Sequence, residues 1–194
     1  RLDAKGWRAV TATELEFYLI DDSGEGFQPP TSPTSGRRSL GPATLSMRML
    51  DEFNAFFDAL YAACDAMGID ADTATSEAGP GQFEINLMHG PDPMRVADDT
   101  WLFKLLVRRL ARSHGLAATF MAKPYAGVAG SGLHMHASLM DRDGRNVFDD
   151  GGPAGSDMLR HAIGGVLAAL PDSTLIFAPH ANSYERLVPH SHAP

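Results

Sequence analysis

Residues 11–20, TATELEFYLI, have the composition of a buried β-strand but carry two acids, Glu14 and Glu16. Successive side chains of a strand point to opposite faces, so the two glutamates share one face about 7 Å apart, and Leu15 and Phe17 share the other. A single pair of acids in this spacing is most often the solvated face of a half-buried strand. Its meaning therefore depends on what the rest of the chain brings to that face.

The length and composition describe an ordinary globular chain. It has 194 residues, 44% hydrophobic and 21% charged, which suits one domain with a sizeable core. The net charge of −8 argues against a nucleic-acid partner and against an anionic membrane surface. The single cysteine, Cys64, excludes an internal disulfide framework and fits a reducing compartment, so we expect a cytoplasmic protein.

Hydrophobic periodicity predicts strands that pair as hairpins, with helices between them. Such a pattern indicates an α+β domain around a mainly antiparallel sheet. The expected strands are 7–20, 69–77, 81–88, 116–123 and 132–141, and the expected helices are 43–67, 93–114 and about 156–170. Residues 21–42 are rich in Gly, Pro and Ser and are expected to form a long loop.

Two of these predicted regions carry further ionisable groups. Glu77 and Glu84 flank the turn of the 69–88 hairpin, where both can face the same side. In LHMHASL, residues 133–139, His134, His136 and Ser138 alternate with apolar residues and so share one face. Three separate strands can thus present acids or imidazoles on one face of the sheet.

Such a cluster needs a means of neutralisation. Four carboxylates within about 5 Å would repel by roughly 3 kcal/mol per pair at an effective dielectric near 20, or about 20 kcal/mol in all. That exceeds the ~5–15 kcal/mol by which whole domains are stable. The acids must be splayed apart, protonated or paired with cations. We favour Mg²⁺ or Mn²⁺, because a carboxylate set with one imidazole suits these ions better than zinc.

Four motifs carry a family resemblance: TELEFYL, SEAGPGQFEINL, FMAKPYAGVAGSGLHMHASL and NSYERLVP, in this order. Together they resemble the catalytic domain of the glutamine synthetase family, particularly the branch that joins glutamate to amines other than ammonia. The resemblance covers nearly all of residues 1–194 and implies a curved antiparallel sheet flanked by helices. It also implies an active site between subunits of a ring-shaped homo-oligomer.

The chemistry that the resemblance implies is a two-step ligation. ATP phosphorylates the γ-carboxylate of glutamate, and an amine then displaces phosphate from the γ-glutamyl phosphate. By resemblance, Glu16, Glu77 and Glu84 hold one Mg²⁺ or Mn²⁺, and Glu14 and His134 hold a second, together with a glutamate beyond residue 194. The chain begins without Met, and we expect it to be a partial catalytic domain that is inactive by itself.

Further roles follow from the same resemblance. His136 and Ser138 match nucleotide-phosphate contacts, and Gly130 matches a backbone contact to glutamate. Arg186 matches the arginine at the substrate carboxylate, where a planar guanidinium can pair with two oxygens. Lys123 lies in a family-like motif without an assigned role.

Two positions depart from the ammonia-using members of the family. Ala129 stands where they carry asparagine, and His192 stands where they carry a glutamate that helps to bind and deprotonate ammonium. A neutral imidazole does not attract a small cation as a carboxylate does, so we expect a larger amine. Three alternatives stay open: an ammonia-using glutamine synthetase, a catalytically silent family member acting as a structural or regulatory module, and a different metal-dependent phosphotransferase.

Overall fold

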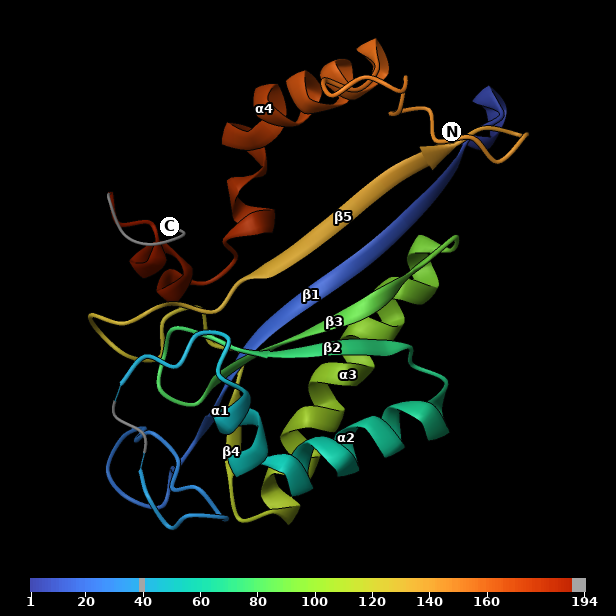
Figure 1. The fold of residues 1–194 in the computed structure, drawn as a ribbon. Helices are drawn as coiled ribbons and strands as arrows, with labels where there is room; N and C mark the ends of the chain where they lie inside the picture. Colours follow the sequence, from blue (N-terminus) through green and yellow to red (C-terminus); the bar gives the residue numbers. More distant parts are fainter. Residues whose placement is uncertain (39–40, 190–194) are drawn as a thin grey trace.

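The long strand β1 (Arg8–Ile20) organises the sheet (Figure 1). β3 (Gln82–Gly90) pairs with one edge of β1, and β2 (Ala71–Ser76) pairs with β3. Two strands follow one another along the other edge of β1: β5 (Leu133–Met140) and β4 (Ala117–Thr119). All these pairings are antiparallel. The computed structural model describes residues 1–38 and 41–189, and it confirms the predicted α+β class.

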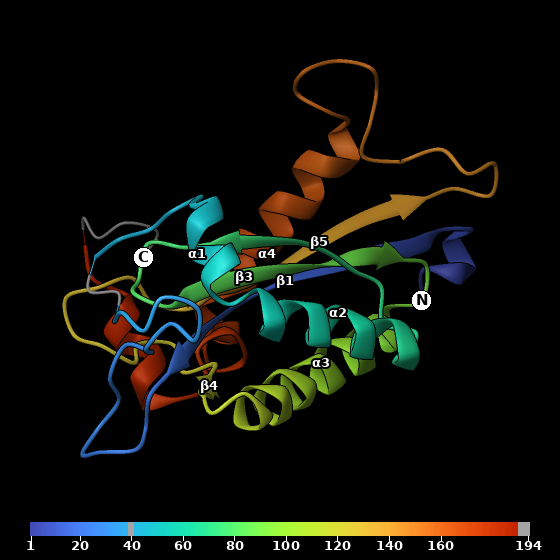
Figure 2. The same ribbon diagram turned by 60° about the horizontal axis from the view of Figure 1, so that its bottom comes forward.

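Helices cover one face of the sheet, as Figure 2 shows for α2 (Asn54–Met67) and α3 (Pro93–Ser113). Alternation along β1 and β3 explains the packing, because every second side chain on these strands turns toward the helices and most of these side chains are apolar. The resulting core is rich in aromatic rings, and its members include Leu15, Phe17, Leu19, Phe53, Phe56, Phe57, Leu60, Phe83, Ile85, Phe103 and Val107.

The opposite face of β1 and β3 carries the polar half of the alternation. One end of it is closed by packing, where Tyr18 and Ile20 of β1 meet Ala117 and Tyr125. The rings of Tyr18 and Tyr125 meet edge to face with centroids 5.4 Å apart. Beyond this small cluster the face is open, and Glu14, Glu16 and the partners described below lie on it.

The predicted helix over 43–67 is wrong at its start and in its middle. The chain forms two helices, α1 (Met47–Glu52) and α2, which are separated at Phe53. Leu45 has a φ of 55°, in the left-handed region that a right-handed helix excludes, and its N–H donates to the Ser76 carbonyl. The side chain of Ser46 then caps α1 by accepting from the Met49 N–H.

The predicted strand over 116–123 is also too long. β4 covers only Ala117–Thr119, because β5 occupies the same edge of β1 from Arg8 to Leu15. Residues 120–132 therefore leave the sheet as a loop between the two strands, and this loop carries the AKPYAGVAGSG motif.

The last helix, α4 (Asp157–Phe177), runs past the residue 170 at which we expected it to end. Pro171 lies within it instead of stopping it. No residue of α4 is buried in the described structure. Seven of its large apolar side chains are exposed there: Ile163, Val166, Leu167, Leu170, Leu175, Ile176 and Phe177. Short 3₁₀ helices, η1 (Asp3–Lys5) and η2 (Ala181–Arg186), lie near the ends of the described chain. Within this part of the chain no helix is long and apolar enough to cross a bilayer.

The cap of α3 gives a first testable prediction. Asp92 accepts hydrogen bonds from the N–H groups of Met94 and Arg95 at 3.0 and 3.3 Å. Replacing Asp92 by alanine leaves both donors to solvent, so we expect a loss of about 1 kcal/mol in the free energy of unfolding. Urea denaturation measures this loss. Asp98→Ala, an exposed substitution further along the same helix, is the control and should cost less; equal losses would contradict the cap's role.

Candidate active site

Strand register brings the predicted ligands together. Glu14 of β1 lies opposite His134 of β5, and Glu16 lies opposite Glu84 of β3. Glu14 and Glu16 are two residues apart on one strand, so the three strands present their ionisable groups to the same side of the sheet. Glu77, which directly follows β2, approaches from the end of the hairpin.

Glu14 is the hub of this cluster. One carboxylate oxygen is 2.9 Å from Nδ1 of His134, and the other is 2.8 Å from Nε2 of His136. Partial burial tends to raise the pKa of Glu14, but the hydrogen bonds to the two imidazoles outweigh it and leave the pKa below its ordinary value. Glu14 therefore stays ionised between two histidines.

Glu84 behaves in the opposite way. Burial, followed by the charges of Glu14, Glu77 and Glu16, raises the pKa of Glu84 to about 7. A carboxyl group that holds its proton near neutrality, because other acids surround it, is the electrostatic signature expected of a cation site. Protonation of Glu84 thus supplies part of the neutralisation that this cluster of acids needs.

This raised pKa predicts a pH dependence of stability in the metal-free protein. Glu84 binds its proton more tightly in the folded state, with a pKa of about 7 against an ordinary 4.5. Stability should therefore fall as pH rises from about 4.5 to about 7. With allowance for partial solvent screening, we expect Glu84→Gln to abolish about 2 kcal/mol of this fall.

Urea unfolding at pH 5 and at pH 7.5 measures the effect in protein treated with a chelator. Glu25→Gln removes an exposed acid from the surface loop and serves as the control, which should retain the pH dependence of the unaltered protein. If Glu84→Gln loses as much stability between the two pH values as that control, the coupling among the carboxylates is wrong.

The chemistry of the cluster fits a divalent metal ion. Glu14, Glu84 and His134 each offer one ligand atom, and these atoms lie within 4.8 Å of one another. Two carboxylates and one imidazole form a hard, oxygen-dominated donor set, which suits Mg²⁺ or Mn²⁺. The part of the chain that the structure describes thus brings together three of the five predicted ligands. The set differs from the predicted grouping, because Glu84 was expected at one ion and Glu14 with His134 at the other.

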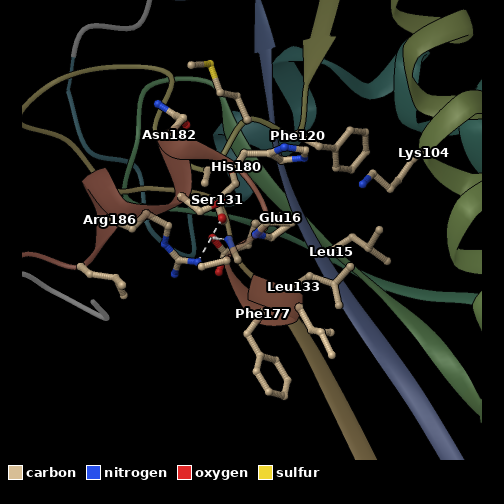
Figure 3. Close-up of a pocket in the computed structure, with 18 residues that line it drawn as sticks. Leu15, Glu16, Lys104, Phe120, Ser131, Leu133, Phe177, His180, Asn182 and Arg186 are labelled. Carbon is tan, nitrogen blue, oxygen red and sulfur yellow. Dashed lines mark hydrogen bonds between the residues drawn. The ribbon is translucent and has the colours of Figure 1, made fainter. Parts of the chain in front are cut away.

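A cavity of about 490 Å³ adjoins this face where β5 begins, and Figure 3 shows its lining. Glu16 contributes to its wall, and Arg186 reaches it from η2. The guanidinium of Arg186 donates to the Ser131 carbonyl at 3.1 Å, and the Gly132 N–H donates to Glu16 at 2.9 Å. The cavity thus joins a predicted metal ligand to the predicted carboxylate-binding arginine, while Glu14, Glu84 and His134 lie on the open face outside its lining.

The loop that edges this cavity requires glycine at position 130. A Cβ atom added to Gly130 would lie 2.4 Å from the Ala122 carbonyl oxygen and 2.5 Å from Cγ of Arg186. The neighbouring Lys123 is held by Asn182, which accepts from its N–H at 2.7 Å and donates to its carbonyl at 3.0 Å. These two hydrogen bonds tie the AKP segment to η2.

The other predicted residues have mixed outcomes. Glu77 lies close enough to Glu84 to raise its pKa, but it is not in the three-residue ligand set. Ser138 shares the face of His136 and lies opposite Val10, toward the far end of β5. The roles assigned to Gly130, His136 and Ser138 in substrate binding stay predictions. His192 lies outside the described residues.

Sequence reasoning missed two residues of the site, Tyr18 and Gln82. Both belong to the same alternating series as the glutamates. Tyr18 continues the series of Glu14 and Glu16, and Gln82 precedes Glu84 by two residues. Tyr18 and Gln82 are also paired across β1 and β3. The period of two therefore places both side chains on the same face as the glutamates, but neither carries the charge by which the glutamates stand out in the sequence.

Comparison with known proteins identifies the family. The family model of the glutamine synthetase catalytic domain matches residues 1–194. A γ-glutamylputrescine synthetase of Escherichia coli is 39% identical over the whole chain, and a glutamine synthetase of Halobacterium salinarum is 34% identical. A γ-glutamylethanolamide synthetase of Streptomyces coelicolor is 33% identical, also over the whole chain.

A solved structure agrees with the sequence relatives. The GmaS complex with ADP superposes on all of the chain with a TM-score of 0.85 at 28% identity, and the match covers 44% of that protein. The chain likewise spans 42%, 42% and 41% of the three relatives from Escherichia coli, Halobacterium salinarum and Streptomyces coelicolor. Fold, ligand cluster and sequence match agree, and the chain belongs to the glutamine synthetase family, whose catalytic-domain model it matches from end to end.

Proposed function

We propose that the protein containing this chain is an ATP-dependent ligase that activates the γ-carboxylate of glutamate and joins it to an amine other than ammonia. The observation that carries the proposal is the convergence of Glu14, Glu84 and His134 on one open face, beside a cavity edged by Glu16 and Arg186. The site thus offers two kinds of charge close together. The acids can hold a cation that binds phosphates, and the guanidinium can pair with a carboxylate.

The acidic face is proposed to prepare the nucleotide end of the reaction. Glu14, Glu84 and His134 would hold one divalent ion, and Glu16 with Glu77 would supply further oxygens to the same face. Such an ion would neutralise the terminal phosphates of ATP while the phosphoryl group passes to the γ-carboxylate oxygen of glutamate. His136 is fixed by Glu14 at 2.8 Å and is thereby oriented toward the same face, where we assign it and Ser138 to the nucleotide phosphates.

The cavity is proposed to receive glutamate. Arg186 offers a planar fork of N–H donors that matches a carboxylate, and its link to the Ser131 carbonyl fixes the guanidinium against the loop. Glycine at position 130 lets the backbone of the loop approach the aliphatic part of the Arg186 side chain, where a Cβ atom would collide. The loop and Arg186 would together orient the substrate so that its γ-carboxylate points toward the acidic face.

The amine is the least constrained substrate. It must be neutral to attack the activated carboxylate, so a base must remove its proton, and His192 is our candidate for that base. Ala129 gives the loop no side-chain amide, in contrast to the asparagine expected of ammonia users. The relatives named for putrescine and ethanolamide products support a larger amine. Ammonia is the second candidate, because a glutamine synthetase of similar identity is among the relatives.

A hydroxamate assay tests the reaction on the intact protein. Hydroxylamine traps an activated γ-glutamyl group, so we expect ATP- and glutamate-dependent γ-glutamyl hydroxamate. ATP turnover with putrescine, ethanolamine, methylamine and ammonia then identifies the acceptor. Hydroxamate formation with a clear preference for ammonia would overturn the amine assignment alone, whereas turnover without any hydroxamate would overturn glutamate activation.

We also propose that the intact protein is a ring-shaped homo-oligomer whose subunits complete each other's sites. The chain spans less than half of its relatives, and the apolar side chains of α4 lack cover in the described structure. Such a helix is normally packed against other protein. Sedimentation velocity of the intact protein measures the assembly, and a monomer with full ligase activity would contradict it.

A further inference from the structure

Gln82, at the start of β3, is 2% exposed, and both its amide nitrogen and its amide oxygen are hydrogen-bonded. Its nitrogen Nε2 donates to Oε2 of Glu16 and to the Gly130 carbonyl, both at 3.0 Å. Its oxygen Oε1 accepts from the Gly79 N–H at 2.9 Å and lies 3.2 Å from the Tyr18 hydroxyl. One buried side chain thus connects a predicted metal ligand with the loop that edges the cavity.

The orientation of this amide is determined by its surroundings. Nε2 faces two carbonyl or carboxylate acceptors and Oε1 faces the Gly79 N–H donor, so the flipped amide would lose these three hydrogen bonds. The turn also fits closely around the network, because a Cβ atom added to Gly79 would lie 1.8 Å from the Tyr18 hydroxyl. Gln82 is therefore held in one position before any ligand binds.

The contacts of Glu16 show what this position achieves. Its Oε2 accepts from both Gln82 and the Gly132 N–H, at 3.0 and 2.9 Å. Those two hydrogen bonds use the lone pairs of Oε2, so Glu16 can offer a cation only its other oxygen, Oε1. The amide that fixes Glu16 also holds the Gly130 carbonyl, and a displacement of one is transmitted to the other.

We propose that Gln82 is a positioning residue that sets Glu16 as a one-oxygen metal ligand and couples it to the 129–132 loop. The inference rests on the proposed function, in which Glu16 binds the metal and the loop binds glutamate. Tyr18 allows the effect on the loop to be separated from the effect on Glu16. Its hydroxyl donates to the Ala129 carbonyl at 2.6 Å and so anchors the loop without touching Glu16.

The test compares Mn²⁺ binding and glutamate kinetics in the intact protein. Gln82→Met keeps the length of the side chain but removes both N–H donors. We expect it to weaken Mn²⁺ binding, measured by calorimetry without substrates, by about 10- to 100-fold and to raise the KM for glutamate. Tyr18→Phe should raise the KM for glutamate and leave Mn²⁺ binding unchanged. Gln82→Glu, which has the same shape as glutamine, replaces Gln82→Met if the latter does not fold.

Two further variants make each outcome decisive. Thr100→Val removes a buried hydrogen bond of 2.8 Å to Thr13 on the helix-covered side of the sheet, and it reproduces a loss of stability without touching the network. Thr100→Val should bind Mn²⁺ normally, and a loss equal to that of Gln82→Met would overturn the inference. Glu16→Gln should lose Mn²⁺ affinity. If it does and Gln82→Met does not, only the positioning role is overturned; if Glu16→Gln binds normally, the metal role of Glu16 is itself wrong.

Discussion

Replacing Glu14 by glutamine is expected to lower the ligase activity of the intact protein about a thousandfold. Glu14 offers one ligand atom to the cation site and fixes both His134 and His136 through its two oxygens. Glutamine has the same shape but neither the charge nor the second acceptor. Loss of one preorganised electrostatic contact typically costs 10²–10³ in kcat, and here two oriented imidazoles are disturbed as well.

The measurement is the initial rate of γ-glutamyl hydroxamate formation at saturating ATP, glutamate and Mn²⁺. Glu25→Gln removes the same charge from an exposed loop and should retain the activity of the unaltered protein. Far-ultraviolet circular dichroism checks that both variants are folded. A folded Glu14→Gln protein with more than about a tenth of the normal rate is incompatible with Glu14 as the hub of the metal site.

Arg186→Lys is expected to produce the second large effect, a loss of about a hundredfold in kcat/KM for glutamate. Lysine keeps the positive charge but cannot form the planar, two-pronged contact with a carboxylate. The substitution also removes the guanidinium that donates to Ser131, so the loop loses a contact at the cavity. The loss should fall mainly on the KM for glutamate and leave the KM for ATP nearly unchanged.

Arg160→Lys is the matched control. Arg160 is an exposed arginine at the start of α4, and its guanidinium pairs with Asp157 at 2.6 Å. It does not line the cavity. It should change neither KM. Equal losses in the KM values for ATP and glutamate in Arg186→Lys would assign Arg186 to the general stability of the site and would remove it from the glutamate pocket.

The ligand face could be predicted from the sequence because its information is local. A period of two places Glu14 with Glu16, and His134 with His136, on one face whatever the strands pair with. The strands of the hairpin and β5 were long enough and regular enough for their ends to be predicted closely. The register between strands was not predicted, but the apolar half of the pattern restricts it, since a slip by one residue would bury the acids among Leu15 and Phe17.

The remaining features depend on contacts between distant segments. The end of β4 at Thr119 is set by β5, which takes the edge of β1. Pro171 remains inside α4, although a proline is normally expected to end or kink a helix. Gln82 forms hydrogen bonds to residues up to 66 positions away in sequence, and a neutral amide carries no charge by which the sequence could single it out.

The central claim is that Glu14, Glu84 and His134 form one cation site on the open face of the sheet. Crystals of the intact protein grown with Mn²⁺, measured at the manganese absorption edge, test it most directly. We expect an anomalous peak bonded to these three side chains, and its loss in Glu84→Gln crystals. Manganese bound only elsewhere, with none at Glu14, Glu84 and His134, would show that these residues do not form the cation site.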